Sequence, residues 1–474
     1  MAKLGIGKNA TYFTSALILQ KILSFVYFYF LSNNITHEPF GRYVFALSYT
    51  SLFSIFIDLG MTQILIRESS RSLEKANAYL KNIITLKIFL AVITFAVLFV
   101  FIVISGKSKE VIYLVSLSSV IMILDAFTIS FWAIFRSHQN MFYESTATIF
   151  VQIIIFIFGL ASLFLTHNIF YIMLALVIAS VFNFLYSLIL LKTKFHYSIM
   201  PSWNIDIIRH FLYLLPVFAL GGIFVKIYNA SDTVLLGFLS SDASVGLYSV
   251  PAKVITSLAQ IIPSAFVASI YPVFSEYYKN SKEELKKTFL KSFLYIIIIS
   301  LPITGGLLIL IPKILNALWK SYAEISLTFI IMSFAIPFVF LAFPTGYLLL
   351  ACDRQKNNTI NRGIMAAASL TLNFILIPLY GFLGSGIAFL VVNIIVFVLD
   401  MIYVRKAIPL HFSDFSQVLT KSLFACIMMM GAVYAISQKF HFVFAILGGM
   451  LVYFALLIFL KAVKIQEMKK LLRV

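Results

Sequence analysis

The chain has 474 residues, of which 61% are hydrophobic and only 11% charged, and its mean hydropathy is +1.00. This composition excludes a water-soluble fold, because too few polar side chains remain to cover a surface in contact with water. The net charge of +18 is spread between apolar stretches and not gathered on one domain, which argues against nucleic acid as a partner.

Apolar stretches long enough to cross a ~30 Å hydrocarbon core follow one another along nearly the whole chain. A first set of six spanning helices is expected at residues 12–31, 43–65, 83–105, 111–135, 145–165 and 169–191. A second set follows at residues 211–235, 245–271, 293–315, 325–350, 364–379 and 383–404, and a final pair at 419–436 and 442–460. The pattern predicts an all-α integral membrane protein with about fourteen transmembrane helices.

The two sets of six predict an N-terminal bundle (1–192), a C-terminal bundle (193–405), and a last helix pair with a basic tail (406–474). Three residues of the first set recur in the second at an offset of 205 positions: Lys21, Gly41 and Tyr43 match Lys226, Gly246 and Tyr248. Repeats with an even number of spans share one orientation, so a pseudo-two-fold axis along the membrane normal is expected to relate the bundles. A substrate site would then lie between them, near the midplane.

The distribution of lysine and arginine predicts the topology. Most of the 36 cationic residues fall on one side if the N-terminus is cytoplasmic, and the long polar loops at 67–81 and 279–291 lie on that side. We therefore expect a protein of the cytoplasmic (inner) membrane with both termini in the cytoplasm.

Proline distinguishes the two sets. Eight of the twelve prolines fall in or directly after spans seven to ten and none in the first six: Pro216, Pro251, Pro263, Pro272, Pro302, Pro312, Pro337 and Pro344. Because proline removes a backbone donor, these helices are expected to bend or unwind, as moving parts or as static packing.

Ionisable residues inside spans cost about 2.5 to 3.5 kcal/mol each on insertion scales, so they point to function. Lys21, Lys226 and Lys253 are expected to reach a cavity between the bundles and bind an anion. Snorkelling toward an interface is the alternative, and it is the interpretation for Lys87. Asp125 is expected to neutralise a lysine or to exchange a proton, whereas Asp58 and Asp400 lie nearer helix ends and are expected to face water.

Metal and covalent chemistry find no support in the sequence. The seven histidines lie in loops or at span ends without ligand spacing, and the two cysteines, Cys352 and Cys426, are far apart. We expect no metal, no other cofactor and no enzymatic site.

Several motifs, taken in order, resemble those of the polysaccharide flippases, particularly the O-antigen type, of the multidrug/oligosaccharidyl-lipid/polysaccharide exporter superfamily. They are Phe40-Gly41-Arg42-Tyr43, Asp58-Leu59-Gly60 with Arg67-Glu68, the run from Asp232 to Gly237, Val245-Gly246-Leu247-Tyr248, and the run from Tyr380 to Gly384. The resemblance covers nearly the whole chain.

The resemblance implies translocation of an undecaprenyl-diphosphate-linked oligosaccharide from the cytoplasmic to the external leaflet by alternating access. Cavity-facing cations of helices one and eight in the family correspond to Lys21 and Lys253, although relatives often carry arginine there, and only arginine binds phosphate in a bidentate manner. Expected substrate-binding residues are Lys21, Lys226, Lys253, Arg42 and Asn229; expected coupling or ion-pair residues are Asp58, Asp125 and Asp232.

Two other functions remain as alternatives. A cation-coupled multidrug antiporter of the same superfamily would present acidic groups such as Asp58 and Asp125 to its substrate. A membrane glycosyltransferase or polymerase would need catalytic carboxylates or a large external loop, and neither is evident. The expected partners are the lipid bilayer and the lipid-linked glycan, with a polysaccharide polymerase and a chain-length regulator as further candidates.

Overall fold

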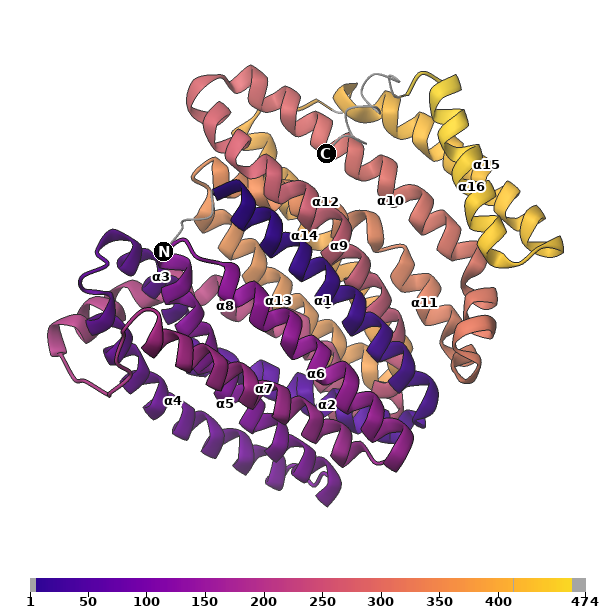
Figure 1. Ribbon diagram of the computed structural model, residues 1–474. Coiled ribbons are helices and arrows are strands. Elements are labelled where there is room, and N and C mark those ends of the chain that lie inside the picture. The colour runs from indigo at the N-terminus through magenta and orange to yellow at the C-terminus, as the bar shows by residue number, and fades with distance from the viewer. Residues whose placement is uncertain (1–5, 412, 463–474) are drawn as a thin grey trace. The chain divides into compact units, whose positions relative to one another are not determined.

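A computed structural model describes residues 6–411 and 413–462, and every regular element in these ranges is a helix (Figure 1). Fourteen helical segments are long and apolar enough to span a membrane, so the protein is a multi-pass membrane protein and the predicted fold class is confirmed. The basic tail expected near the C-terminus falls mostly after residue 462, outside the described residues.

The chain forms two compact units, Met1–Ser249 (unit 1) and Val250–Val474 (unit 2). Unit 1 contains the first six spans, the seventh span and the start of the eighth. The predicted division at residue 193 follows the sequence repeat and stays a prediction.

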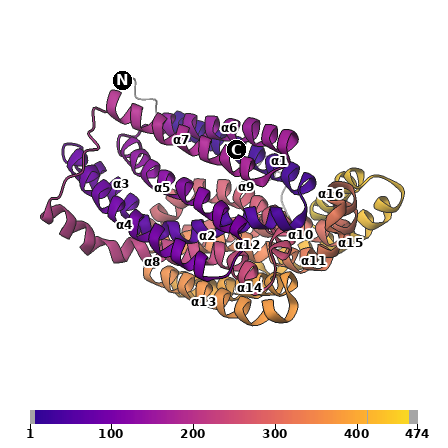
Figure 2. The same cartoon turned by 90° about the horizontal axis from the view of Figure 1, so that it is seen from below.

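Unit 1 is a bundle in which α1 packs on α6, α6 on α7, α7 on α5, and α2 lies between α5 and α8. Figure 2 shows α1, α6 and α7 side by side. Its helices are α1 (Ile6–Asn34), α2 (His37–Asp58), α3 (Met61–Arg71), α4 (Ala76–Ile104), α5 (Lys109–Ser137), α6 (Phe142–Thr166), α7 (Ile169–Thr193), α8 (Ile205–Leu239) and the first residues of α9 (Asp242–Asn280).

Two predicted spans are broken in the structure: 325–350 is divided between α11 (Ser326–Ser333) and α12 (Ile336–Ala351), and 43–65 between α2 and α3. The stretch 43–65 was expected as one helix, but α2 ends at Asp58 and α3 begins at Met61. Leu59 and Gly60 both have left-handed backbone angles (φ 45° and 80°), which end a helix and which glycine adopts without strain. The Asp58 carboxylate then accepts a hydrogen bond from the backbone N–H of Thr62, so it caps the new helix.

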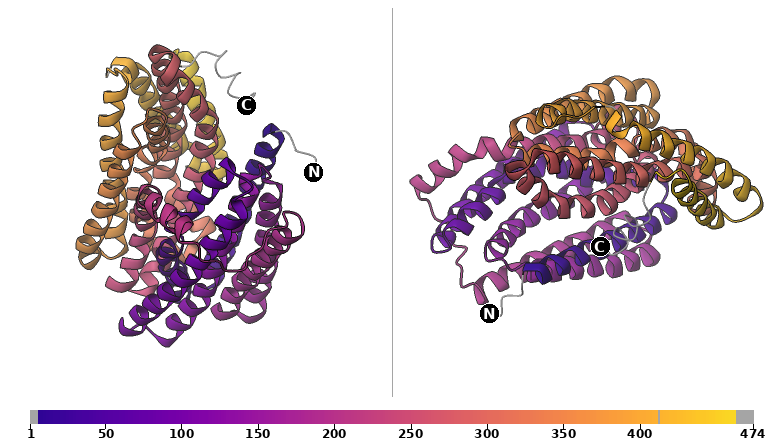
Figure 3. Two further views of the ribbon diagram at one scale, coloured as in Figure 1. Left: turned by 90° about the vertical axis from the view of Figure 1, so that its left-hand side faces the viewer. Right: turned by 90° about the horizontal axis from the view of Figure 1, so that it is seen from above.

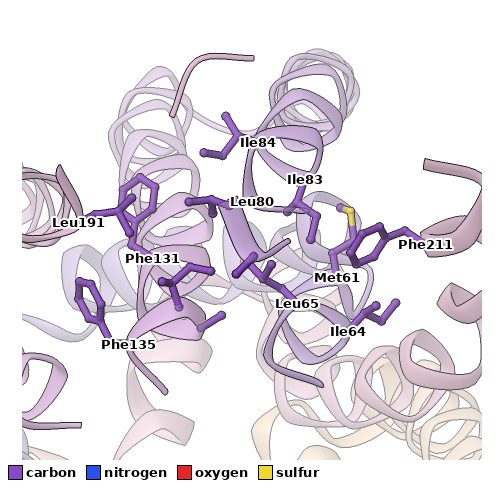
Figure 4. Packing of buried hydrophobic residues seen from close by; sticks show 13 residues of the cluster. Met61, Ile64, Leu65, Leu80, Ile83, Ile84, Phe131, Phe135, Leu191 and Phe211 are labelled. Carbon is purple, nitrogen blue, oxygen red and sulfur yellow. The ribbon is translucent and has the colours of Figure 1, made fainter. Parts of the chain in front are cut away.

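A hydrophobic core holds the α3 end of unit 1 together (Figure 4). Leu65 of α3, Leu80 of α4, Phe131 of α5 and Phe211 of α8 are among its buried members. Burial of such side chains contributes about 1.5–3 kcal/mol each, so this core fixes the end at which α2 is interrupted.

The segment that connects α7 to α8 is hydrogen-bonded to side chains of α4. The backbone N–H groups of Ser198, Ser202 and Asn204 donate to the side chains of Asn77, Thr85 and Asn82, at 3.1, 2.9 and 2.7 Å respectively. These polar side chains satisfy backbone donors that would otherwise have to bond water.

Unit 2 comprises the remainder of α9 and the helices α10 (Lys282–Leu318), η1 (Lys320–Ile325), α11 (Ser326–Ser333), α12 (Ile336–Ala351), α13 (Gln355–Tyr380), α14 (Phe382–Ala407), α15 (Ser413–Lys439) and α16 (Phe442–Phe459). Within it, α13 packs on α14, α14 on α12, and α10 on α15. The pair α15 and α16, yellow in Figure 3, lies side by side.

Most of the internal prolines do not unwind their helices, contrary to one part of the expectation. Pro251, Pro263 and Pro272 all lie within the continuous helix α9, and Pro302 and Pro312 lie within α10. The α-helix is interrupted just before Pro337, at Phe334 and Ala335 between α11 and α12, although both residues keep right-handed backbone angles. Membrane helices tolerate a lost hydrogen bond where neighbouring groups satisfy the freed carbonyl.

Candidate functional site

Two lysines occupy equivalent deep positions in unit 1. Lys21 lies 13 residues before the end of α1 at Asn34, and Lys226 lies 13 residues before the end of α8 at Leu239. At a rise of 1.5 Å per residue this is about 20 Å from each helix end, within the hydrocarbon core. Both side chains are half-buried. Among the described residues no carboxylate pairs with Lys21.

Asp125 is an exposed carboxylate in the middle of α5. The hydroxyl of Ser180 on α7 donates to its Oδ1 at 2.7 Å, and its charge interacts with that of Lys226 on α8. Asn229, one turn after Lys226 and on the same helix face, is exposed too. An exposed acid and an exposed amide at this depth mark a polar surface that hydrocarbon would penalise.

Asp58 and Lys87 form a buried ion pair, with Oδ1 and Nζ 2.6 Å apart. The Lys87 side chain is 0% exposed, and its Nζ also donates to the Ala126 carbonyl oxygen at 2.7 Å. The interpretation of Lys87 as a snorkelling lysine is therefore wrong, and Asp58 faces this ammonium group and not water. The reason is tertiary: the partner that holds Lys87 inside lies on a different helix.

The sequence repeat extends to side-chain contacts. Tyr248 donates its hydroxyl to Asp232 Oδ2 at 2.6 Å, and at the positions 205 residues earlier Tyr43 interacts with Tyr27. The same helix pair thus carries a carboxylate in one repeat and a phenol in the other. Asp232 has hydroxyl and amide donors from Tyr248 and Thr233 as its hydrogen-bonding partners.

Five charged residues gather where three turns of unit 1 meet, and we call them the charge cluster. Arg42 pairs with Glu38 and Glu110, and its Nε lies 3.2 Å from Asp242 Oδ2. Lys107 Nζ lies 2.7 Å from Asp242 Oδ1. The three carboxylates largely satisfy the Arg42 guanidinium, which favours a role in holding this end together; its predicted role in substrate binding stays a prediction.

Beside the cluster, the first turns of α2 and α9 touch backbone to backbone. A methyl group placed on Gly41 would lie 1.6 Å from the carbonyl oxygen of Asp242, and one on Gly246 would lie 2.1 Å from that of His37. His37 and Asp242 are themselves 205 positions apart, so the contact is reciprocal: each glycine admits the other repeat's carbonyl. Only glycine permits this approach.

Unit 2 contains Lys253 and a buried ion pair. Lys253 is half-buried in α9, in the first part of that helix. Asp400 on α14 is 0% exposed and accepts from Arg362 at 2.5 Å and from Asn361 at 2.8 Å. The expectation that Asp400 faces water is therefore wrong.

Sequence reasoning named Arg42 but did not find the other members of the charge cluster, and it did not find Ser180 or Arg362 as parts of polar sites. Glu38, Lys107, Glu110 and Asp242 look like ordinary loop charges until three distant turns are brought together. The one signal of this cluster in the sequence was the recurrence of Gly41 as Gly246, because the two glycines mark the points where the backbones of α2 and α9 approach closely.

Solved structures of known proteins share the fold of this chain. A solved structure of the lipid II flippase MurJ in an inward closed conformation superimposes with a TM-score of 0.76 at 18% identity, covering 95% of this chain and 98% of that one. A multidrug resistance transporter in an inward-facing conformation gives 0.63 at 13% identity, covering 82% and 94%. At these identities the likeness shows the fold.

Sequence comparison adds a curated relative, the capsular polysaccharide biosynthesis protein CapF of Staphylococcus aureus. It is 24% identical over 389 residues, which are 80% of this chain and 94% of the relative. The polysaccharide biosynthesis protein family matches residues 6–278.

The fold and the family match together define a membrane transporter of the multidrug/oligosaccharidyl-lipid/polysaccharide exporter superfamily. Within that class, the chain belongs to the polysaccharide biosynthesis protein family, whose match spans more than half of its residues.

Proposed function

We propose that this protein is a flippase that moves an undecaprenyl-diphosphate-linked oligosaccharide from the cytoplasmic to the external leaflet of the inner membrane by alternating access. The product would serve surface polysaccharide synthesis. Lys21, Lys226 and Lys253 would bind the diphosphate, and Asn229 would contact the head group near Lys226. No covalent chemistry is part of the proposal.

The observation that carries the proposal is the pair of deep lysines at equivalent positions of the repeat. An ion transferred from water to a dry, low-dielectric medium costs on the order of 20 kcal/mol in the idealised case, so a diphosphate needs cationic, hydrated surroundings to cross. Half-buried ammonium groups about 20 Å from a helix end supply positive charge at that depth. A lipid tail needs no such surroundings and stays in the bilayer.

The contact between α2 and α9 supports alternating access. In the proposed topology the turns that carry the charge cluster are external. The reciprocal glycine contact and the ion pairs of Arg42 and Lys107 would close this end while the substrate enters from the cytoplasm. Opening would require the first turns of α2 and α9 to separate.

A second candidate is a cation-coupled multidrug antiporter. The exposed carboxylate of Asp125 favours it, since a cationic substrate would need an accessible acid at membrane depth. Asp232 and Asp58 have hydrogen-bonding or ionic partners and offer less free negative charge. Two lysines near the same depth oppose this candidate by repelling a cation.

The test is export of glycan by lysine variants in cells that lack the native gene. Lys21→Ala, Lys226→Ala and the triple variant with Lys253→Ala should accumulate lipid-linked oligosaccharide in the inner leaflet. A hydrogen bond to a charged group contributes about 1.5–3 kcal/mol, so each single change should slow transport about 10- to 100-fold.

Lys192→Ala is the matched control, because this exposed lysine lies in the last turn of α7. Membrane levels of all variants are compared by immunoblot. Normal glycan export by the triple variant would refute the proposed role of the lysines. Drug efflux coupled to sodium or protons, with intact glycan on deletion of the gene, would favour the antiporter.

A further inference from the structure

The buried face of α3 ends in a carboxylate. Met61, Ile64 and Leu65 follow one another at helical spacing and join a hydrophobic core with α8 (Figure 4). The next position of this face holds Glu68, whose side chain is only 11% exposed. A carboxylate at a buried position needs charged or hydrogen-bonding partners, because water no longer solvates it fully.

Two guanidinium groups and an imidazole share this one carboxylate. Arg71 Nη1 lies 3.3 Å and Arg67 Nε 3.6 Å from Glu68 Oε1, and His210 Nε2 of α8 lies 3.5 Å from Oε2. The side chains of Arg67, Arg71 and His210 are 40%, 62% and 48% exposed. We call these four residues the basic cluster, because two arginines and one glutamate leave a net positive charge.

Packing of α3 on α8 accounts for His210 but not for the two arginines. His210 lies on the other helix, whereas Arg67 and Arg71 lie on α3 with Glu68, so their ion pairs join no two elements. Exposed ion pairs within one helix contribute little to stability. Both guanidinium groups carry more N–H donors than a shared carboxylate can accept, and guanidinium binds phosphate in a bidentate manner.

The opposite end of α2 has the reverse arrangement of charge. There the charge cluster places three carboxylates around Arg42 and Lys107. α2 has 22 residues, so about 33 Å separate its two ends. Positive charge is therefore in excess at the end that is cytoplasmic in the proposed topology, and negative charge at the external end. An anion is attracted to the first end and repelled from the second.

We propose that the basic cluster is a diphosphate-binding entry site, which captures the anionic head group of the lipid-linked substrate before the lysines bind it. This entry site deepens the proposed function and rests on it. His210 and Lys226 lie 16 residues apart on α8, about 24 Å along the helix, so the cluster is separate from the lysines. Glu68 holds the two guanidinium groups together, and phosphate oxygens accept from their exposed sides.

Binding of farnesyl diphosphate in the absence of the lysines tests this site. The background is the full-length Lys21→Ala/Lys226→Ala/Lys253→Ala protein in phosphatidylcholine nanodiscs. This protein should bind the probe, and adding Arg67→Gln/Arg71→Gln should weaken binding about tenfold. Arg71→Gln alone leaves Arg67 and His210 beside Glu68, so it should fold normally and still weaken binding several-fold.

Lys192→Gln/Lys194→Gln is the matched control, because it removes two exposed cations from the end of α7. It should leave binding within about twofold of the background. The probe should also bind in discs that contain phosphatidylglycerol. If this phospholipid abolishes probe binding, the cluster holds phospholipid head groups and the entry site is refuted.

Capture of the substrate has a kinetic signature that packing does not have. With the lysines intact, Arg67→Gln/Arg71→Gln should lower kcat/KM for lipid-linked oligosaccharide in proteoliposomes about tenfold at low ionic strength and leave kcat unchanged. The deficit should shrink in ~1 M salt, where the screening length is about 3 Å. An equal loss of kcat, independent of salt, would show that the arginines are structural.

Failure of the entry site and failure of the flippase proposal give different results. If the triple lysine variant binds no probe, or binds it equally without the arginines, the entry site is refuted while export through the lysines stands. If the lysine variants export glycan normally, the proposed function fails, and probe binding by the basic cluster is still measured.

Discussion

Asp400 in unit 2 and Asp125 in unit 1 are both aspartates within spanning helices, yet their surroundings are opposite. Asp400 is 0% exposed and accepts from a guanidinium and an amide. Asp125 is exposed and accepts a hydrogen bond from the Ser180 hydroxyl. Asp400 has the contacts of a structural ion pair, whereas the hydrogen bonding of Asp125 is incomplete. Residue type and depth alone do not separate the two, whereas the completeness of hydrogen bonding does.

The largest loss of stability should come from breaking the ion pair of Asp400 with Arg362, in which the carboxylate is fully hydrogen-bonded. Arg362→Met leaves Asp400 buried and unpaired, which should cost about 3–5 kcal/mol of the free energy of unfolding. Folded domains have only about 5–15 kcal/mol in total, so most of the protein should be lost as aggregate. Fluorescence-detected size exclusion of detergent extracts measures the fraction that remains monodisperse.

Lys226→Met is the matched substitution in unit 1, where the hydrogen bonding of Asp125 is incomplete. It should leave the monodisperse fraction near the wild-type value. The double variant Arg362→Met/Asp400→Leu should recover much of the loss, because an apolar pair of similar volume often replaces a buried ion pair at little cost. Equal destabilisation by Arg362→Met and Lys226→Met would break the distinction between the two sites.

A smaller effect is expected at the contact between the first turns of α2 and α9, where unit 1 is proposed to open. Gly41→Val places a side chain against a backbone carbonyl that cannot rotate away, so the first turns of α2 and α9 should part. Overpacking costs about 1–3 kcal/mol, enough to raise the accessibility of this end about tenfold. The measurement is the rate at which an impermeant maleimide labels a cysteine placed at Glu38; native Cys352 and Cys426 are buried.

Gly306→Val is the control for this change, since the space beside Gly306 in α10 is open. It should leave the labelling rate unchanged. If Gly41→Val labels no faster than the control, the glycine contact is packing and not a gate.

The smallest effect, on the pH dependence of stability, should come from His138. This histidine lies between two spans and is an ordinary titrating group. Burial lowers the pKa of His138, whose Nε2 lies 3.0 Å from the hydroxyl of Tyr197. The neutral ring is thus favoured in the folded state. Its stabilisation is fully present above the unfolded pKa of about 6.5 and is lost as pH falls through the lower folded pKa.

The half-exposed position of His138 limits this contribution to less than about 1 kcal/mol, or about 2–4 °C in Tm at most. Thermal unfolding of wild type and His138→Gln at pH 8 and pH 5 tests it. The drop in Tm on acidification should be smaller for His138→Gln. An equal drop would show that other groups carry the acid sensitivity.

Much of the fold follows from sequence because lipid imposes one solution on long apolar stretches, and all fourteen predicted spans have a helical counterpart. The break at Leu59-Gly60 was missed because hydropathy continues across it. Pairings between helices could not be predicted from the sequence. Lys87 pairs with Asp58, and Asp400 pairs with Arg362, and in both cases the partner lies on another helix. The repeat of Gly41 and Gly246 was readable, but its reciprocal contact required coordinates.

The segment that joins α7 to α8 has a fixed register, although it contains no regular element. Its amides at 198, 202 and 204 all point to α4, an even-numbered pattern like that of an edge strand. Inserting one residue before position 198 would turn the opposite set of amides toward Asn77, Asn82 and Thr85. Loops usually tolerate insertions, but the hydrogen bonds of this linker to α4 depend on its length. The linker should therefore tolerate insertion or deletion of two residues better than of one.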